Sequence, residues 1–517
     1  MSMAFREADH QSIYLLPPSL SDWLPEGHLA RFVVEIVGKL DLGEFRDAYR
    51  GNGSAAYPPH IMLALLFYGY ATGTYSSRKL ERGTYDSVPL RYIAANTHPD
   101  HDTIAHFRKR FLPQINALFV QILCIAHRMD VLRLGSVSLD GTKIKANASK
   151  HKALSYAHAL KIEKHLQDEV ARLLEAAEHA DAADLPDELM LPEELARREK
   201  RLMSIDKAKK EIERRAAQRA EDAQGDYKQE MAKRAEYEQK TGRKPRGRPP
   251  APPAPGVPRP KDQVNLTDDE SRIMSVSGGG FEQCYNAQAS VDTATMLIVS
   301  QHVTQHVNDK LEIVPALDKL EQLPASLGCV KKLIADHGYF SEANIQACEN
   351  SAVEPFIAAG REKHYVDVFD RFSEPPPLAP DADTGTQMRH KLRTIAGRAT
   401  YALRKQVVEP VFGIIKEAMG FRRFLLRCFT LVQGEWSLVC MAYNLKRLHQ
   451  LLKTNRGKEK GPQSHALAAQ NCLLVAGNRL LEAVRNVFHK AFFKIILPSS
   501  PTWTFKNFVL ALSPTGS

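Results

Sequence analysis

The stretch Ser-Val-Ser-Leu-Asp-Gly-Thr-Lys-Ile-Lys-Ala-Asn, residues 136–147, predicts a half-buried strand that carries a carboxylate. Apolar Val137 and Leu139 alternate with polar neighbours, which is the period of a strand with one face in the core. Asp140 comes at the expected end of this strand, and Gly141 would let the backbone turn sharply away. Because a buried Asp is rare unless it is paired or binds something, Asp140 is a candidate functional residue.

A second apolar run, residues 329–335, also predicts a short strand that ends in an acid, Asp336. Between the two acids, residues 281–292 and 295–302 alternate and predict a β-hairpin. A helix is expected over residues 401–420, with Glu409 and Lys416 on one edge. Pro410 must either kink this helix or begin a new one, and both versions hold Glu409 at a fixed point.

Two strands that each end in Asp, a hairpin between them and a later helix with a Glu have the order of an RNase H-like domain. The predicted fold class is therefore α/β, with a mixed sheet flanked by helices, a long helical insertion and an all-α N-terminal domain. Acids in this arrangement suit phosphodiester cleavage, because carboxylates can hold two Mg²⁺ ions about 3.5–4 Å apart that stabilise the entering and leaving oxygens.

Composition shifts divide the chain into four predicted parts. We expect a helical DNA-binding domain over residues 1–125, a catalytic domain from 130–150 and 265–450, a helical insertion over 151–264 and a tail of unknown role over 451–517. The insertion contains two long helical patterns, which either fold back on each other or pair with a second subunit. Residues 193–248 hold 18 Lys and Arg against 12 Asp and Glu, so +6 of the net charge of +10 lies there.

The N-terminal region predicts short helices with basic exposed ends. The last of them, residues 103–111, carries Arg108, Lys109 and Arg110. Such helices are what a helix-turn-helix-like DNA reader needs, and the alternative is a small bundle with charged faces. A cluster of His and Asp residues at 98–106 could suggest a metal site, but Asp102 or Thr103 is expected to cap the helix that follows.

The insertion ends in the basic arm Gly-Arg-Lys-Pro-Arg-Gly-Arg-Pro-Pro, residues 242–250. The arm resembles an AT-hook, in which Gly lets an extended backbone lie in a narrow minor groove while flanking arginines, here Arg246 and Arg248, contact the groove. A proline-stiffened linker that happens to be basic fits equally well.

Seven dispersed cysteines without a CxxC pair indicate free thiols in a reducing compartment. The most apolar run, residues 61–70, is too short to span a bilayer, and the first residues lack a signal-peptide core. We therefore expect a cytoplasmic protein whose positive charge suits a polyanionic partner.

Six stretches together resemble the DDE transposases of bacterial insertion sequences, in the subgroup with a helical N-terminal domain and a long insertion after the first catalytic Asp. They are Leu-Leu-Pro-Pro-Ser-Leu-Ser-Asp-Trp-Leu (15–24), Ser-Leu-Asp-Gly-Thr-Lys-Ile-Lys-Ala-Asn (138–147), Tyr-Asn-Ala-Gln-Ala-Ser-Val-Asp (285–292), Ala-Asp-His-Gly-Tyr (335–339), Val-Glu-Pro-Val-Phe-Gly-Ile-Ile-Lys (408–416) and Glu-Trp-Ser-Leu-Val-Cys-Met-Ala-Tyr-Asn-Leu-Lys (435–446).

The resemblance implies that Asp140, Asp336 and Glu409 form a metal-binding catalytic triad for Mg²⁺, which Mn²⁺ can replace. It implies binding of terminal inverted repeats, nicking at the ends of an element and transfer of the freed 3′-OH to target DNA. A synaptic homodimer and a nucleoid-associated location in the bacterial cytoplasm are expected as well. A nuclease without strand transfer and a DNA-binding protein with a decayed site are the alternatives.

Many such enzymes carry a Tyr, Arg, Glu, Lys signature with the Arg four residues before the Glu. Tyr401 and Arg404 are three apart as expected, but Arg404 lies five residues before Glu409, and Lys405 occupies the expected Arg position. Lys416 fits, and contact with a phosphate near the cut is its expected task. Asp292, a rival acid, is expected in a turn, and His337 in a loop.

Overall fold

The computed structural model describes residues 19–49, 56–182, 191–245, 247–276, 278–360, 373–379 and 382–459. Its first part is helical. The central helix α3 has no exposed face between Ile61 and Ala71, since every residue of this stretch is buried. The helices are α1 (Leu29–Gly38), α2 (Gly43–Asp47), α3 (Pro59–Ala71), α4 (Ser77–Asp86), α5 (Val88–Ile93), α6 (His101–Arg110) and α7 (Leu112–Arg128).

A mixed sheet follows, with the strand order β6-β5-β1-β7-β8. β4 also pairs with β5. The strands are β1 (Ser136–Lys145), β4 (Arg272–Ser275), β5 (Phe281–Asp292), β6 (Ile298–Thr304), β7 (Lys332–Ala335) and β8 (Glu354–Ile357). β5 pairs antiparallel with both β1 and β6, whereas β7 pairs parallel with β1 and β8. The expected hairpin is therefore β5–β6, and β1, which contains Asp140, is a neighbour of β7, which Asp336 follows.

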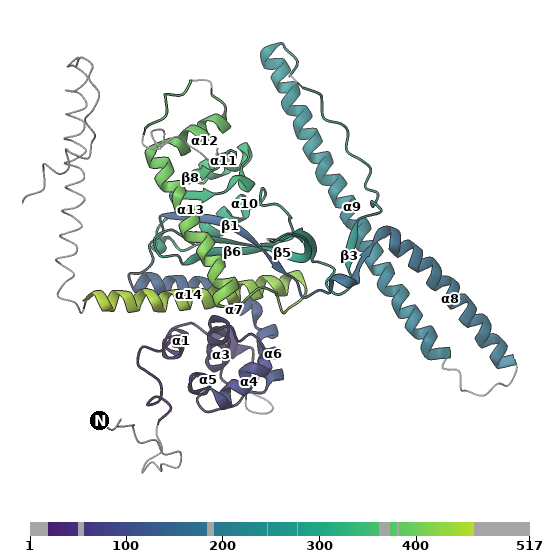
Figure 1. Cartoon of the computed structure of the whole chain (residues 1–517), viewed down its shortest axis with the longest axis horizontal. Coiled ribbons are helices and arrows are strands. Elements are labelled where there is room, and N and C mark those ends of the chain that lie inside the picture. Colours follow the sequence, from purple (N-terminus) through teal and green to yellow (C-terminus); the bar gives the residue numbers. More distant parts are fainter. Residues whose placement is uncertain are drawn as a thin grey trace, which may run out of the picture. The chain divides into compact units, whose positions relative to one another are not determined.

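Helices pack against this sheet (Figure 1). They are α10 (Ile313–Glu321), α11 (Glu342–Asn350), α12 (Thr384–Arg393), α13 (Ile395–Gly413) and α14 (Phe429–Glu459). A π-helical turn (Ile414–Ala418) directly follows α13, and short 3₁₀ turns lie at Lys150–Lys152, Ala325–Leu327 and His337–Tyr339. The indole of Trp436 in α14 is fully buried and donates to the backbone carbonyl of Gln288 in β5 at 3.0 Å. α12 begins after Asp383, whose side chain caps it by accepting from the amide of Thr386.

The insertion consists of α8 (Tyr156–Ala182) and α9 (Leu191–Thr241), which run side by side (Figure 1). Leu166 of α8 packs with Ile205 and Ile212 of α9, so the two helical patterns form an apolar seam within one chain. A small sheet of β2 (Ala153–Ser155) and β3 (Gln263–Asn265) closes the base of the insertion. Of the two expected arrangements, the structure has the folded-back one.

No helix in the described ranges is long and apolar enough to cross a membrane. Most of the tail of unknown role, residues 460–517, lies outside the described residues, as does Arg246 of the basic arm.

Candidate active site

The parallel register of β1 and β7 brings Asp140 and Asp336 to neighbouring positions. Ser138 pairs with Ile334, and the two acids lie two residues further along their chains. Asp336 is the N-cap of the turn after β7, and its Oδ1 accepts from the amide of Gly338 at 2.7 Å. Residues that lie 196 positions apart in the sequence are thus adjacent in the sheet.

Asp140 does not end its strand, as the sequence suggested, because β1 continues to Lys145. Gly141 stays in the strand instead of turning out of it. A Cβ at this position would lie 2.2 Å from Nε2 of Gln288 and 2.7 Å from Oδ1 of Asp309, distances that are too short for a side chain. The glycine therefore leaves room for polar groups beside Asp140.

The carboxyl group of Asp140 sits in an environment that disfavours its charge. Burial raises its pKa to about 7, and the negative charges of Asp336 and Asp309 act in the same direction, while a hydrogen bond from Gly141 and the charge of Arg404 oppose them. Carboxylate oxygens are the ligands that Mg²⁺ and Mn²⁺ prefer, and a divalent cation would neutralise this local excess of negative charge. The residues present therefore fit a hard divalent ion.

Glu409 lies on α13, which continues through Pro410, and its side chain is half exposed. The guanidinium of Arg404 donates to Glu409 Oε1 at 3.1 Å and to Asp140 Oδ2 at 3.4 Å, so it links two of the three acids. Among the described residues, no three His, Cys, Asp or Glu side chains gather closely enough to hold one metal ion. Glu409 is thus joined to Asp140 through Arg404.

Arg404 and Lys405, the two basic residues before Glu409, have different environments on α13. Arg404 is nearly buried and reaches Glu409, whereas Lys405, at the expected Arg position, is exposed. Tyr401 lies one turn earlier on α13 and is partly buried. Lys416 lies on the π-helical turn, and its ammonium donates to the backbone carbonyl of Lys143 at 3.3 Å, which places it beside β1. Burial lowers the pKa of Lys416.

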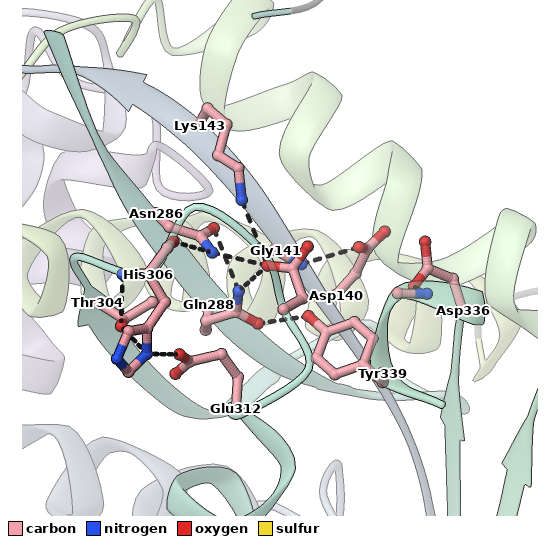
Figure 2. A network of polar contacts seen from close by, with 12 residues as sticks. Asp140, Gly141, Lys143, Asn286, Gln288, Thr304, His306, Glu312, Asp336 and Tyr339 are labelled. Carbon is pink, nitrogen blue, oxygen red and sulfur yellow. Dashed lines mark hydrogen bonds and ion pairs between the residues drawn. The ribbon is translucent and has the colours of Figure 1, made fainter. Parts of the chain in front are cut away.

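The sequence reasoning missed a polar network next to Asp140 (Figure 2). Its centre is Asp309, whose Oδ1 accepts from Nδ2 of Asn286 at 2.6 Å, from Nε2 of Gln288 at 2.7 Å and from Lys143 at 3.4 Å. Tyr339 donates to the amide oxygen of Gln288. One available signal was the alternation in β5, where Asn286 and Gln288 share a face and are polar although the strand is buried.

The rival candidates have structural tasks. Asp292 is buried in the β5–β6 turn and accepts from the amide and hydroxyl of Thr295, at 2.8 and 2.7 Å. His337 is exposed, and its Nδ1 lies 3.2 Å from the carbonyl oxygen of Ala358. Asp100, and neither Asp102 nor Thr103, is the N-cap of α6, and it accepts from the amide of Thr103 at 2.8 Å.

The basic residues at the end of α6 have different environments. Arg108, expected at a DNA-contacting surface, is only 8% exposed and donates to the hydroxyl of Tyr70 and to the carbonyl of Tyr75. Its partner Tyr70 in turn donates to Glu435, a fully buried carboxyl of α14, at 3.0 Å. Arg108 is therefore a core residue, because its charge lies near a buried acid. Lys109, Arg110 and, in the arm, Arg248 are exposed.

Comparison with protein-family models gives two matches. Residues 18–110 match a transposase domain (DUF772), and residues 254–445 match a transposase DDE domain. The second match contains Asp336 and Glu409, and the insertion separates it from Asp140. A DDE domain implies an RNase H-like fold, which agrees with the mixed sheet, so the predicted fold class is confirmed. The comparisons with curated proteins and with solved structures found no match.

Proposed function

Because this chain is a DDE-class transposase of the insertion-sequence type, an enzyme that cleaves and transfers DNA with the help of metal, we propose that it binds the terminal inverted repeats of its element and performs two-metal cleavage and strand transfer. The proposed metal is Mg²⁺, which Mn²⁺ can replace. The proposed ligands are Asp140, Asp336 and Glu409.

The observation that carries this proposal is the register of β1 and β7, which makes Asp140 and Asp336 neighbours from distant parts of the chain. When bound, divalent ions at these oxygens would stabilise the charge on the entering and leaving oxygens of the phosphodiester. The half-exposed Glu409 supports the same role, because its carboxylate is accessible and is oriented by Arg404.

Basic residues around these acids are proposed to hold the DNA backbone. Lys416 and Arg404 flank Asp140, and Tyr401 precedes them on α13. Lys109 and Arg110 at the end of α6, together with Arg246 and Arg248 of the arm, would neutralise phosphates further away. We propose that two subunits pair two element ends in a synaptic homodimer, with residues 1–125 as the DNA-binding domain.

The test is cleavage and joining of labelled DNA that carries the inverted repeats flanking the gene. Asp140→Asn, Asp336→Asn and Glu409→Gln should each abolish both products in Mg²⁺, because each removes a metal ligand. Glu417→Gln is the matched control for Glu409→Gln, since Glu417 is exposed and lies two turns further along the same helical segment. Cleavage at the wild-type rate by Asp140→Asn would refute the proposal.

Two outcomes would replace the proposed function with an alternative. Hydrolysed ends that are never joined to target DNA would identify a nuclease without strand transfer. Specific binding of the repeats without metal-dependent chemistry in the wild-type protein would identify a DNA-binding protein with a decayed site.

A further inference from the structure

Asp309 lies in the segment between β6 and α10. It is not a member of the expected triad of acids, nor of the Tyr, Arg, Glu, Lys signature. Its side chain is 23% exposed. The carboxylate accepts hydrogen bonds from two strands, namely from Lys143 on β1 and from the side-chain amides of Asn286 and Gln288 on β5. All three donors reach Oδ1, whereas Oδ2 makes no hydrogen bond to any residue that the structure describes.

Both oxygens of Asp309 lie close to the backbone next to the two aspartates. A Cβ on Gly141 would come within 2.7 Å of Oδ1. A Cβ on Gly338 would come within 3.8 Å of Oδ2 and within 3.0 Å of Asp336 Oδ1, so Asp309 and Asp336 approach the same point. Asp309 therefore borders both β1, which carries Asp140, and the turn that carries Asp336.

A directed chain of hydrogen bonds connects Asp309 to this turn through Gln288 and Tyr339, whose mutual contact is drawn in Figure 2. An ionised carboxylate can only accept, so Gln288 must present its NH₂ group to Asp309. The amide oxygen of Gln288 then faces Tyr339, which donates its hydroxyl proton to it. Tyr339 is fully buried, and burial raises its pKa well above the ordinary value, so the phenol keeps this proton. Tyr339 lies in the same 3₁₀ turn that Asp336 caps.

We propose that Asp309 is a positioning residue for the transposase reaction. Through Gln288 and Tyr339, it holds the turn that carries Asp336 against the strand that carries Asp140. The inference rests on the proposed metal-dependent chemistry of Asp140 and Asp336. Residues that orient metal ligands in this way typically change metal affinity or activity 10- to 100-fold when they are replaced, which is roughly the effect expected here.

The experiment compares Asp309→Leu, Asp309→Asn, Tyr339→Phe and the double variant Asp309→Leu/Tyr339→Phe in the full-length chain. It measures single-turnover cleavage of element-end DNA, the Kd for that DNA, and Mn²⁺ binding without DNA by electron paramagnetic resonance. Asp309→Leu should lower the cleavage rate and the Mn²⁺ affinity by roughly 10- to 100-fold and leave the DNA Kd unchanged. Asp309→Asn keeps an oxygen acceptor for Gln288 and should recover most of both losses.

The double variant decides whether Asp309 acts through Tyr339. If it does, the double variant should be no worse than Asp309→Leu, because both changes break one chain of contacts. Losses that multiply would overturn the inference, and so would an Asp309→Asn variant as defective as Asp309→Leu. Asp318→Asn, an exposed acid on α10, is the control and should behave as wild type.

Two further readouts keep the test independent of folding and of the proposed function. Thermal unfolding identifies a variant that is unfolded. If Asp309→Leu is unfolded, Tyr339→Phe, which removes only the hydroxyl that donates to Gln288, carries the test, and a Tyr339→Phe variant with wild-type cleavage rate and Mn²⁺ affinity would overturn the inference. If the wild-type protein binds Mn²⁺ but neither cuts nor joins DNA, the proposed function fails. The Mn²⁺ affinities of the variants still decide the role of Asp309 in that case.

Discussion

Arg404 joins Glu409 to Asp140, because one guanidinium nitrogen donates to Glu409 Oε1 at 3.1 Å and the other to Asp140 Oδ2 at 3.4 Å. The helix that carries Arg404 and Glu409 is thereby fastened to the central strand of the sheet. Since the guanidinium is nearly buried, little water competes for these contacts.

Arg404→Ala and Arg404→Lys should both lower the cleavage rate, by roughly 10- to 100-fold. Lysine does not rescue the loss because a single ammonium cannot reproduce the planar fork that reaches two carboxylates. Lys405→Ala is the matched control, since the neighbouring side chain is exposed and should be dispensable. A defect in Lys405→Ala with normal cleavage by Arg404→Ala would mean that the expected signature spacing holds after all.

Gly141→Ala and Gly225→Ala should change the free energy of unfolding in opposite directions. A methyl group at 141 would meet Gln288 Nε2 at 2.2 Å, and such overpacking costs roughly 1–3 kcal/mol. Gly225 lies in α9 with nothing within 4 Å of the added atom, so alanine should stabilise the helix by roughly 0.5–1 kcal/mol. Urea unfolding of both variants checks this, and an unaffected Gly141→Ala would show that the network can move aside.

Much of the fold follows from local patterns, because apolar residues at alternate positions in residues 136–139 and 281–292 fit strands. The structure buries both faces of these strands, so that polar Ser138, Asn286 and Gln288 are buried as well. Asp140 and Asp336 could be identified because each directly follows a short run of apolar strand residues. Asp309 could not, because it lies in an irregular segment and its three hydrogen-bond partners come from two distant strands, β1 and β5. Arg108 was misplaced because the burial of a charge depends on Tyr70 and Glu435, which only the tertiary structure brings together.

Tyr70→Phe should destabilise the protein by roughly 1–3 kcal/mol, because it removes a hydroxyl that lies between Arg108 and a fully buried Glu435. Tyr85→Phe is the control, as Tyr85 is 57% exposed. Thermal or urea unfolding gives the difference between the two variants. Equal stability of both would show that Arg108 and Glu435 are satisfied without the hydroxyl.

Lys109→Ala should weaken DNA binding and lower the salt slope by roughly one, as expected when one phosphate contact is lost. Removing residues 243–248 should flatten the slope further, by roughly 0.9 for each phosphate contact in the arm. Lys39→Ala, at the C-cap of α1, is the control, since this lysine is exposed and pairs with Glu35. An unchanged slope after the deletion would mean that the arm is only a linker.

Asp140→Asn should have opposite effects on stability with and without metal. A carboxyl whose pKa is raised in the folded protein, here to about 7, makes folding less favourable once the pH rises past its ordinary value near 4. At pH 8 without metal, the variant should therefore be more stable than wild type, by roughly 1.4 kcal/mol for each unit by which the pKa is raised. Metal reverses the order, because only the wild type gains the stabilisation that comes from binding an ion to the folded state. Thermal melts with chelator and with Mg²⁺ check both signs, and a variant that is less stable than wild type in chelator would show that Asp140 is not destabilising in the free site.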